Sequence, residues 1–137
     1  AQRLLNLDPE TESKTDWIWF RKRILENCFR LIRPGRPNVR QALAFSWEIC
    51  RNPDSLNDVM VILKTFFRDL ILFSRAPEAI TNLDFYQAYA DIYQQNLPDV
   101  FHNWLESLFQ TEYRLMFNSS PRLSLDRFFL ELAFDKG

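Results

Sequence analysis

The residue types that most often carry catalysis are few and scattered in this chain. His102 is the only histidine among 137 residues, and it stands between Phe101 and Asn103 without a nucleophile-elbow motif. A zinc site needs three or four Cys, His or carboxylate ligands at characteristic spacing, and Cys28, Cys50 and His102 are too far apart to suggest one. We therefore predict no catalytic residue, no metal site and no enzyme activity for this part of the protein.

Glycine usage argues against the common nucleotide-binding loops. The only glycines are Gly35 and Gly137, so neither a GxxxxGK loop nor a GxGxxG fingerprint can be built. Carboxylate pairs such as Asp54 and Asp58 have the spacing of helix caps and exposed helix faces. We expect no bound cofactor.

Charged residues within the most apolar segment are harder to explain. Lys64, Arg68 and Asp69 interrupt the apolar residues between Val59 and Phe73, where a charge is costly to bury unless it is paired. Either Arg68 and Asp69 emerge at one narrow exposed stripe, or they meet partners from a neighbouring helix or subunit. The sequence leaves both interpretations open.

Positive charge is concentrated near the start of the chain. Residues 1–51 hold ten Lys and Arg against six Asp and Glu, whereas residues 52–137 hold seven against twelve. A candidate basic patch consists of Arg21, Arg23, Arg30, Arg33 and Arg36. It is either a footprint for phosphates or an acidic partner, or a solvated helix face on which Lys22, Glu26 and Arg30 form i, i+4 ion pairs.

The elements that position these residues are predicted to be helices. Hydrophobic residues make up 47% of the chain and aromatic residues 15%, and no long segment alternates with period two. Proline, asparagine and serine signals delimit six segments, at residues 15–32, 38–52, 55–74, 82–96, 96–118 and from 120 onward. The predicted fold class is all-α, a compact bundle of about five to six helices.

Several packing details follow from the pattern. The second helix should face inward with Leu43, Trp47 and Cys50 and lie antiparallel to the first, and Ser55 should cap the third. The fifth should carry Met116 on its apolar side. The four tryptophans either line an apolar cavity or pack in the core; they are Trp17, Trp19, Trp47 and Trp104.

The start of the chain suggests a fragment of a longer protein. Ala1–Leu7 resembles the end of a helix from a preceding unit, and Asp8–Lys14 a connection, which places a boundary near residue 12. The apolar runs are shorter than the ~20 residues of a membrane span. Two cysteines without a disulfide framework favour a reducing, cytoplasmic location.

Two segments resemble a known family. Val61–Phe73, VILKTFFRDLILF, is similar to the LLxxxLRDLLLL helix in the C-terminal domain of δ′ subunits of bacterial DNA polymerase III clamp loaders. Asn118–Asp126, NSSPRLSLD, followed by Phe128, Phe129 and Leu130, resembles that family's closing NxNPRLALExLLL segment. Ser119, Ser124 and the polar pair Lys64-Thr65 depart from the pattern.

The resemblance implies a non-catalytic collar domain. Residues 1–12 would be the tail of a lid domain and a linker, and residues 13–137 the collar. Its partners would be the other clamp-loader subunits, in a five-membered ring that places the sliding clamp on DNA during replication. DNA would be contacted only indirectly, through the complex, and no membrane. A subunit-interface or packing motif would then consist of Lys64, Arg68, Asp69, Pro121 and Arg122.

One alternative function is kept. A ligand-sensing helical domain of a transcription regulator would need a cavity among the tryptophans and a DNA-binding helical pair, which residues 21–52 could imitate.

Overall fold

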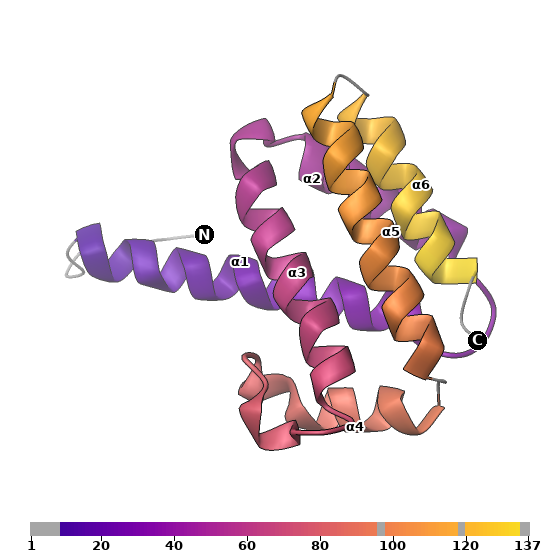
Figure 1. The fold of residues 1–137 in the computed structure, drawn as a ribbon. Helices are drawn as coiled ribbons and strands as arrows, with labels where there is room; N and C mark the ends of the chain where they lie inside the picture. The colour runs from indigo at the N-terminus through magenta and orange to yellow at the C-terminus, as the bar shows by residue number, and fades with distance from the viewer. Residues whose placement is uncertain (1–8, 96–97, 118–119, 135–137) are drawn as a thin grey trace.

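The structure is a computed structural model that describes residues 9–95, 98–117 and 120–134. These residues form helices and turns without any strand, which confirms the predicted all-α bundle (Figure 1). The α-helices are α1 (Pro9–Ile32), α2 (Val39–Cys50), α3 (Leu56–Leu72), α4 (Tyr86–Gln95), α5 (Pro98–Met116) and α6 (Pro121–Phe134). Short 3₁₀ turns occupy Pro53–Ser55, Pro77–Ala79 and Leu83–Phe85. No helix in the described part of the chain is long and apolar enough to cross a membrane.

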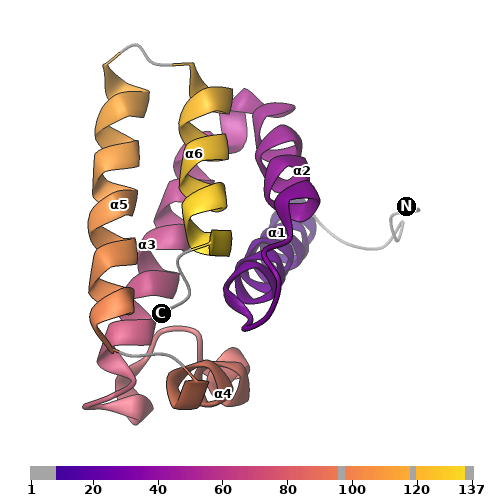
Figure 2. The same ribbon diagram turned by 90° about the vertical axis from the view of Figure 1, so that its right-hand side faces the viewer.

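Helix α3 is the centre of the bundle, as its nearly continuous apolar surface predicts. It packs between α1 and α5, α6 lies between α5 and α2, and α4 lies across one end (Figures 1 and 2). Aromatic rings fill the interior between α3, α5 and α6. Phe67 of α3 makes edge contacts with Trp104 and Phe128, and each of the three is at most 1% exposed.

Helix α1 begins earlier than predicted. Thr15 and Asp16 lie inside the helix, which starts at Pro9, so residues 9–14 are helical and not a connection. Proline at the first helical position is consistent with this start, because its missing N–H would have no partner within the helix there. The predictions for Ala1–Leu7 and Asp8 fall outside the described residues, and the domain boundary near residue 12 stays a prediction.

The first half of α1 projects beyond the bundle (Figure 1). Trp17 and Ile18 in this part of the helix are therefore 40% and 50% exposed. The apolar residues of α1 between Ile24 and Ile32 are buried, and α1 contacts α3, α6 and α2. More than one neighbouring helix therefore covers α1.

Helix α2 packs differently from the prediction. Asn38 caps it, since its side-chain oxygen accepts a hydrogen bond from the Gln41 N–H at 2.9 Å. The chain turns before this cap through Gly35, whose φ of +123° suits glycine. However, α2 lies chiefly along α6 and not antiparallel to α1 (Figure 2). Phe45 stacks on Phe129 with ring centroids 4.5 Å apart.

This docking turns a different face of α2 inward. The buried residues are Ala42, Phe45, Ser46 and Ile49, whereas Trp47 is 51% exposed and Leu43 and Cys50 are half-buried. The predicted face was wrong because α6, and not α1, decides which side of α2 is covered.

Two smaller predictions at helix ends are also wrong. Ser55 makes no capping hydrogen bond to α3; its hydroxyl instead donates to the Asn52 carbonyl oxygen at 2.8 Å within the preceding 3₁₀ turn. Met116, predicted on the apolar side of the fifth helix, is 72% exposed. Helix α5 ends at this residue, and Asn118, the predicted end, lies outside the described residues.

Candidate functional site

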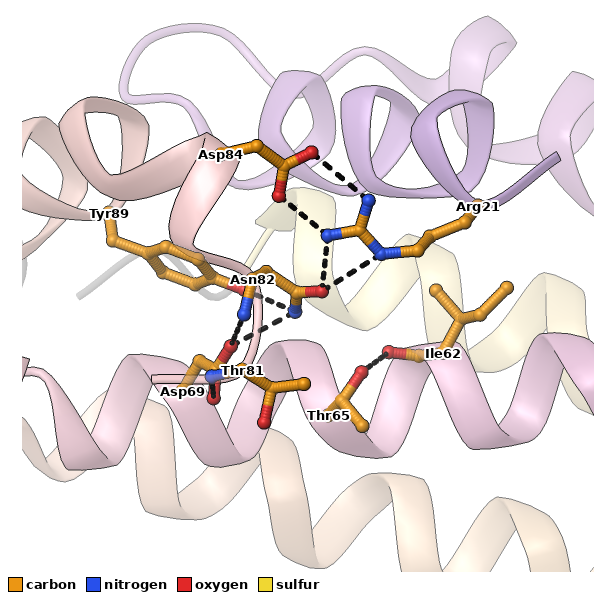
Figure 3. Close-up of polar contacts among 8 residues, drawn as sticks. All are labelled: Arg21, Ile62, Thr65, Asp69, Thr81, Asn82, Asp84 and Tyr89. Carbon is orange, nitrogen blue, oxygen red and sulfur yellow. Dashed lines mark hydrogen bonds and ion pairs between the residues drawn. The ribbon is translucent and has the colours of Figure 1, made fainter. Parts of the chain in front are cut away.

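Asp69 is the centre of the main buried polar cluster (Figure 3). It comes from the apolar helix α3 and is fully buried. Its carboxylate accepts hydrogen bonds from the backbone N–H groups of Thr81 and Asn82, at 3.0 and 2.8 Å, and from the Asn82 side-chain amide at 3.0 Å. A buried carboxylate is tolerated when donors surround it in this way. Asp69 therefore does not lie on an exposed stripe, and its partners are neither on a neighbouring helix nor on another subunit but in the turn segment before α4.

Asn82 connects Asp69 to the first helix. Its amide also donates to the Tyr89 hydroxyl oxygen at 3.1 Å, and its carbonyl oxygen accepts from Nη2 and Nε of Arg21 at 2.8 and 3.2 Å. The same guanidinium pairs with both carboxylate oxygens of Asp84, at 2.6 and 3.0 Å. Asn82 was predicted as a possible cap for the fourth helix, but its side chain makes no capping bond because these partners occupy it.

The cluster shifts the titration of its members. The hydrogen bond from Arg21 lowers the pKa of Asp84, and the same contact raises the pKa of Arg21. Burial, followed by the nearby charge of Asp69, raises the pKa of Tyr89. These shifts favour a charged Arg21, a charged Asp84 and a neutral Tyr89, which are the states that make the observed hydrogen bonds. The cluster therefore fastens the segment before α4 to α1 and α3, which is a structural role.

The other two charges of the apolar helix behave differently. Lys64 forms an ion pair with Glu112 of α5, and both side chains remain more than 30% exposed. Arg68 is exposed and makes no hydrogen bond or ion pair to another described residue. The structure thus separates the three predicted residues, with Asp69 inside, Lys64 between two helices and Arg68 in solvent.

The closing motif contributes a contact between helices. Pro121 is the first residue of α6 and is exposed. The Arg122 guanidinium pairs with Asp126 at 3.1 Å and reaches the Leu43 carbonyl oxygen of α2 at 3.5 Å. Arg122 therefore helps hold α6 against α2, which agrees with a packing role; a contact with another subunit stays a prediction.

The predicted basic patch is divided between two roles. Arg21 belongs to the buried cluster, and Arg23 pairs with Glu48 of α2. Arg30, Arg33 and Arg36 are exposed at the end of α1 and in the loop that follows. Lys22 and Arg30 flank Glu26 on the exposed face, but no ion pair joins these residues in the described structure. Arg30 and Arg36 therefore remain available to a partner.

Sequence reasoning missed an exposed apolar stripe on α5. Its members are Phe109, Tyr113, Met116 and Phe117, which are 51%, 63%, 72% and 61% exposed. Their spacing of four, three and one residues places them on one side of the helix. The Tyr113 and Phe117 rings lie 4.5 Å apart, and Leu123 at the start of α6 is 69% exposed at the same end of the bundle. The sequence signal that could have revealed this stripe is that α5 carries apolar residues on two sides, only one of which can face the core.

The tryptophans do not line a common cavity. Trp104 is fully buried, whereas Trp17, Trp19 and Trp47 are exposed, so core packing holds for Trp104 alone. Within the described residues, no cluster of three or more His, Cys, Asp or Glu side chains could hold a metal ion.

Comparison with known proteins gave no relative. No family model matches the chain, and neither a curated protein nor a solved structure is significantly similar to it.

Proposed function

We propose that this chain is a non-catalytic assembly domain of the clamp-loader collar type, resembling the C-terminal domain of δ′ subunits. Its partners in this proposal are the other subunits of a DNA polymerase III clamp loader. The observation that carries the proposal is the exposed apolar stripe on α5, formed by Phe109, Tyr113, Met116 and Phe117.

The stripe has the composition of a protein interface. Aromatic residues and methionine are enriched at such interfaces, and contiguous exposed apolar patches commonly mark them. Helix α5 lies at one edge of the molecule, and no other described helix covers its outer side (Figure 2). Burying four large apolar side chains in a partner would contribute about 1.5–3 kcal/mol each before the cost of association is subtracted.

The interior of the bundle supports a rigid scaffold. Helices α3, α5 and α6 are joined by aromatic contacts, and the Ser107 hydroxyl of α5 donates to the Glu131 carboxylate of α6. The hairpin of α5 and α6 can therefore present its outer surface without rearranging, which lowers the entropic cost of binding.

A substitution on the stripe tests the proposal. The 137-residue chain would be co-expressed with the other clamp-loader subunits of its source organism and purified through a tag on one of them. We expect the chain to copurify, and the double variant Phe109→Asp, Tyr113→Asp to reduce its recovery at least tenfold, because two charges would be buried in the interface.

The control is the double variant Val39→Asp, Leu83→Asp. It places the same charges at two apolar residues, 41% and 55% exposed, that lie away from α5. It should copurify like the wild type, and circular dichroism melts should show that both variants fold. If the wild-type chain does not copurify at any salt concentration, the proposal is wrong and the ligand-sensing alternative gains weight.

A further inference from the structure

Helices α1 and α2 form an open corner on the side of the molecule away from α5 (Figure 2). A groove of about 450 Å³ follows the exposed face of α1 from Ile18 to Arg30 and is closed by Glu48 of α2. A second groove of about 320 Å³ shares Arg23, Asn27 and Glu48 with the first and extends it to Arg51 at the end of α2. The two grooves are therefore neighbours, and the Arg23–Glu48 ion pair lines both of them.

This corner is strongly basic. Residues 17–51 hold eight Lys and Arg against two Glu, although the whole chain has a net charge of −1. Two of the cations are already paired, Arg21 with Asp84 and Arg23 with Glu48. Four others are exposed and make no hydrogen bond or ion pair to a described residue; they are Lys22, Arg30, Arg36 and Arg40. Lys22 and Arg30 line the first groove, and exposed cations without a partner attract polyanions.

Each of the two helices carries an exposed tryptophan. Trp19 lines the first groove and is 71% exposed. Trp47 is 51% exposed on the outer face of α2, and the Arg51 guanidinium lies 4.7 Å from the centroid of its ring. Exposed aromatic faces beside a basic groove are the features on which the unpaired bases of a single strand stack.

We propose that the α1–α2 corner is a binding surface for single-stranded nucleic acid. The exposed cations contact the phosphates, and Trp19 and Trp47 stack on bases. An acidic peptide would also be attracted by the charge, but it would gain little from two exposed indole rings. The proposal is independent of the collar proposal, in which this domain meets DNA only through the complex.

Fluorescence anisotropy with a labelled 20-nucleotide oligothymidine tests this proposal on the 137-residue chain. Four phosphate contacts predict a slope of log K against log salt of about −2.8 for a single strand, so affinity should fall about 50-fold between 50 and 200 mM salt. The double variant Lys22→Gln, Arg30→Gln removes two of these contacts and should halve the slope. The matched control Arg68→Gln, Arg75→Gln changes two exposed arginines away from the corner and should leave the slope unchanged.

The tryptophans distinguish nucleic acid from a general polyanion. The double variant Trp19→Ala, Trp47→Ala should weaken oligothymidine binding at least about tenfold at every salt concentration while leaving the slope unchanged. Unlabelled polyglutamate of the same charge should compete poorly. Equal competition by polyglutamate, unchanged binding by the tryptophan variant, or no binding at 50 mM salt would each overturn the proposal.

Discussion

Arg68 and Asp69 are adjacent in α3, but only Asp69 is buried. The Asp69 carboxylate accepts three hydrogen bonds from Thr81 and Asn82, whereas Arg68 faces solvent. Replacing Asp69 by Asn removes the charge and exchanges one acceptor oxygen for an NH2 donor that faces existing donors. We expect Asp69→Asn to lower the free energy of unfolding by roughly 3 kcal/mol, and Arg68→Ala by less than about 0.5 kcal/mol.

Urea denaturation followed by tryptophan fluorescence measures both values. Equal, small losses for the two variants would contradict the structural role assigned to Asp69.

The ion pair between Asp84 and Arg21 of α1 should make the stability of the protein depend on pH. The pKa of Asp84 is lowered in the folded state, chiefly by the hydrogen bond from Arg21, so the contact contributes fully above the unfolded carboxyl pKa of about 3.9. The contribution is lost as the pH falls through the lower, folded pKa. We therefore expect wild type to be more stable than Asp84→Asn at pH 7 and equally stable near pH 2. A difference that stays constant across this range would show that the ion pair contributes nothing.

The two cysteines should differ in reactivity. Both are free, and burial raises the pKa of each thiol, but Cys28 is fully buried and Cys50 only partly. Since the thiolate is the nucleophile, both should react slowly, and Cys28 only after unfolding. Labelling with a thiol reagent at pH 8, followed by peptide mass spectrometry, should find Cys50 modified first in the native protein. Modification of Cys28 at the same rate would contradict its burial.

Much of the buried cluster could not be predicted from the sequence. Asp69 was conspicuous because a charge in an apolar helix requires an explanation. Its partners lie in the segment before α4, whose path depends on where the 3₁₀ turns at Pro77–Ala79 and Leu83–Phe85 direct the backbone. The pattern of apolar and polar residues in this segment does not determine the path of its backbone. For this reason the sequence suggested only a helix cap for Asn82.

At the scale of elements, the sequence predicts where helices end better than which face they bury. Asn38 and the prolines placed the limits of α2 and the start of α6 to within about two residues, because caps and proline act through local backbone geometry. The buried face of α2 depends on α6, which comes much later in the chain. The exposed stripe on α5 was missed for a related reason, since apolar residues were assumed to face the core.

Two neighbouring aromatic residues test the packing of α2. Phe45 is 3% exposed and stacks on Phe129, whereas Trp47 is 51% exposed. We expect Phe45→Ala to lower the free energy of unfolding by about 3–5 kcal/mol, because it leaves a cavity, and Trp47→Ala by less than about 1 kcal/mol. Thermal or urea melts of both variants provide the measurement. The reverse order would show that α2 buries the face predicted from its sequence.

At the scale of the whole molecule, two different surfaces lie on opposite sides of one bundle. The α5 stripe is apolar, and the α1–α2 corner is basic with exposed indole rings. Figure 2 shows α5 at one edge and α2 at the other, with α3 and α6 between them. A partner subunit on α5 would therefore leave the basic corner open to solvent, so the two proposed interactions are compatible.

The proposed assembly with clamp-loader subunits is tested by the mass of the reconstituted complex. The chain would be mixed with the purified subunits of its source and analysed by size-exclusion chromatography with light scattering. We expect a five-membered complex that contains one copy of this chain and does not form with the Phe109→Asp, Tyr113→Asp variant. Elution of the wild-type chain apart from the other subunits, at low and at moderate salt, would contradict this expectation.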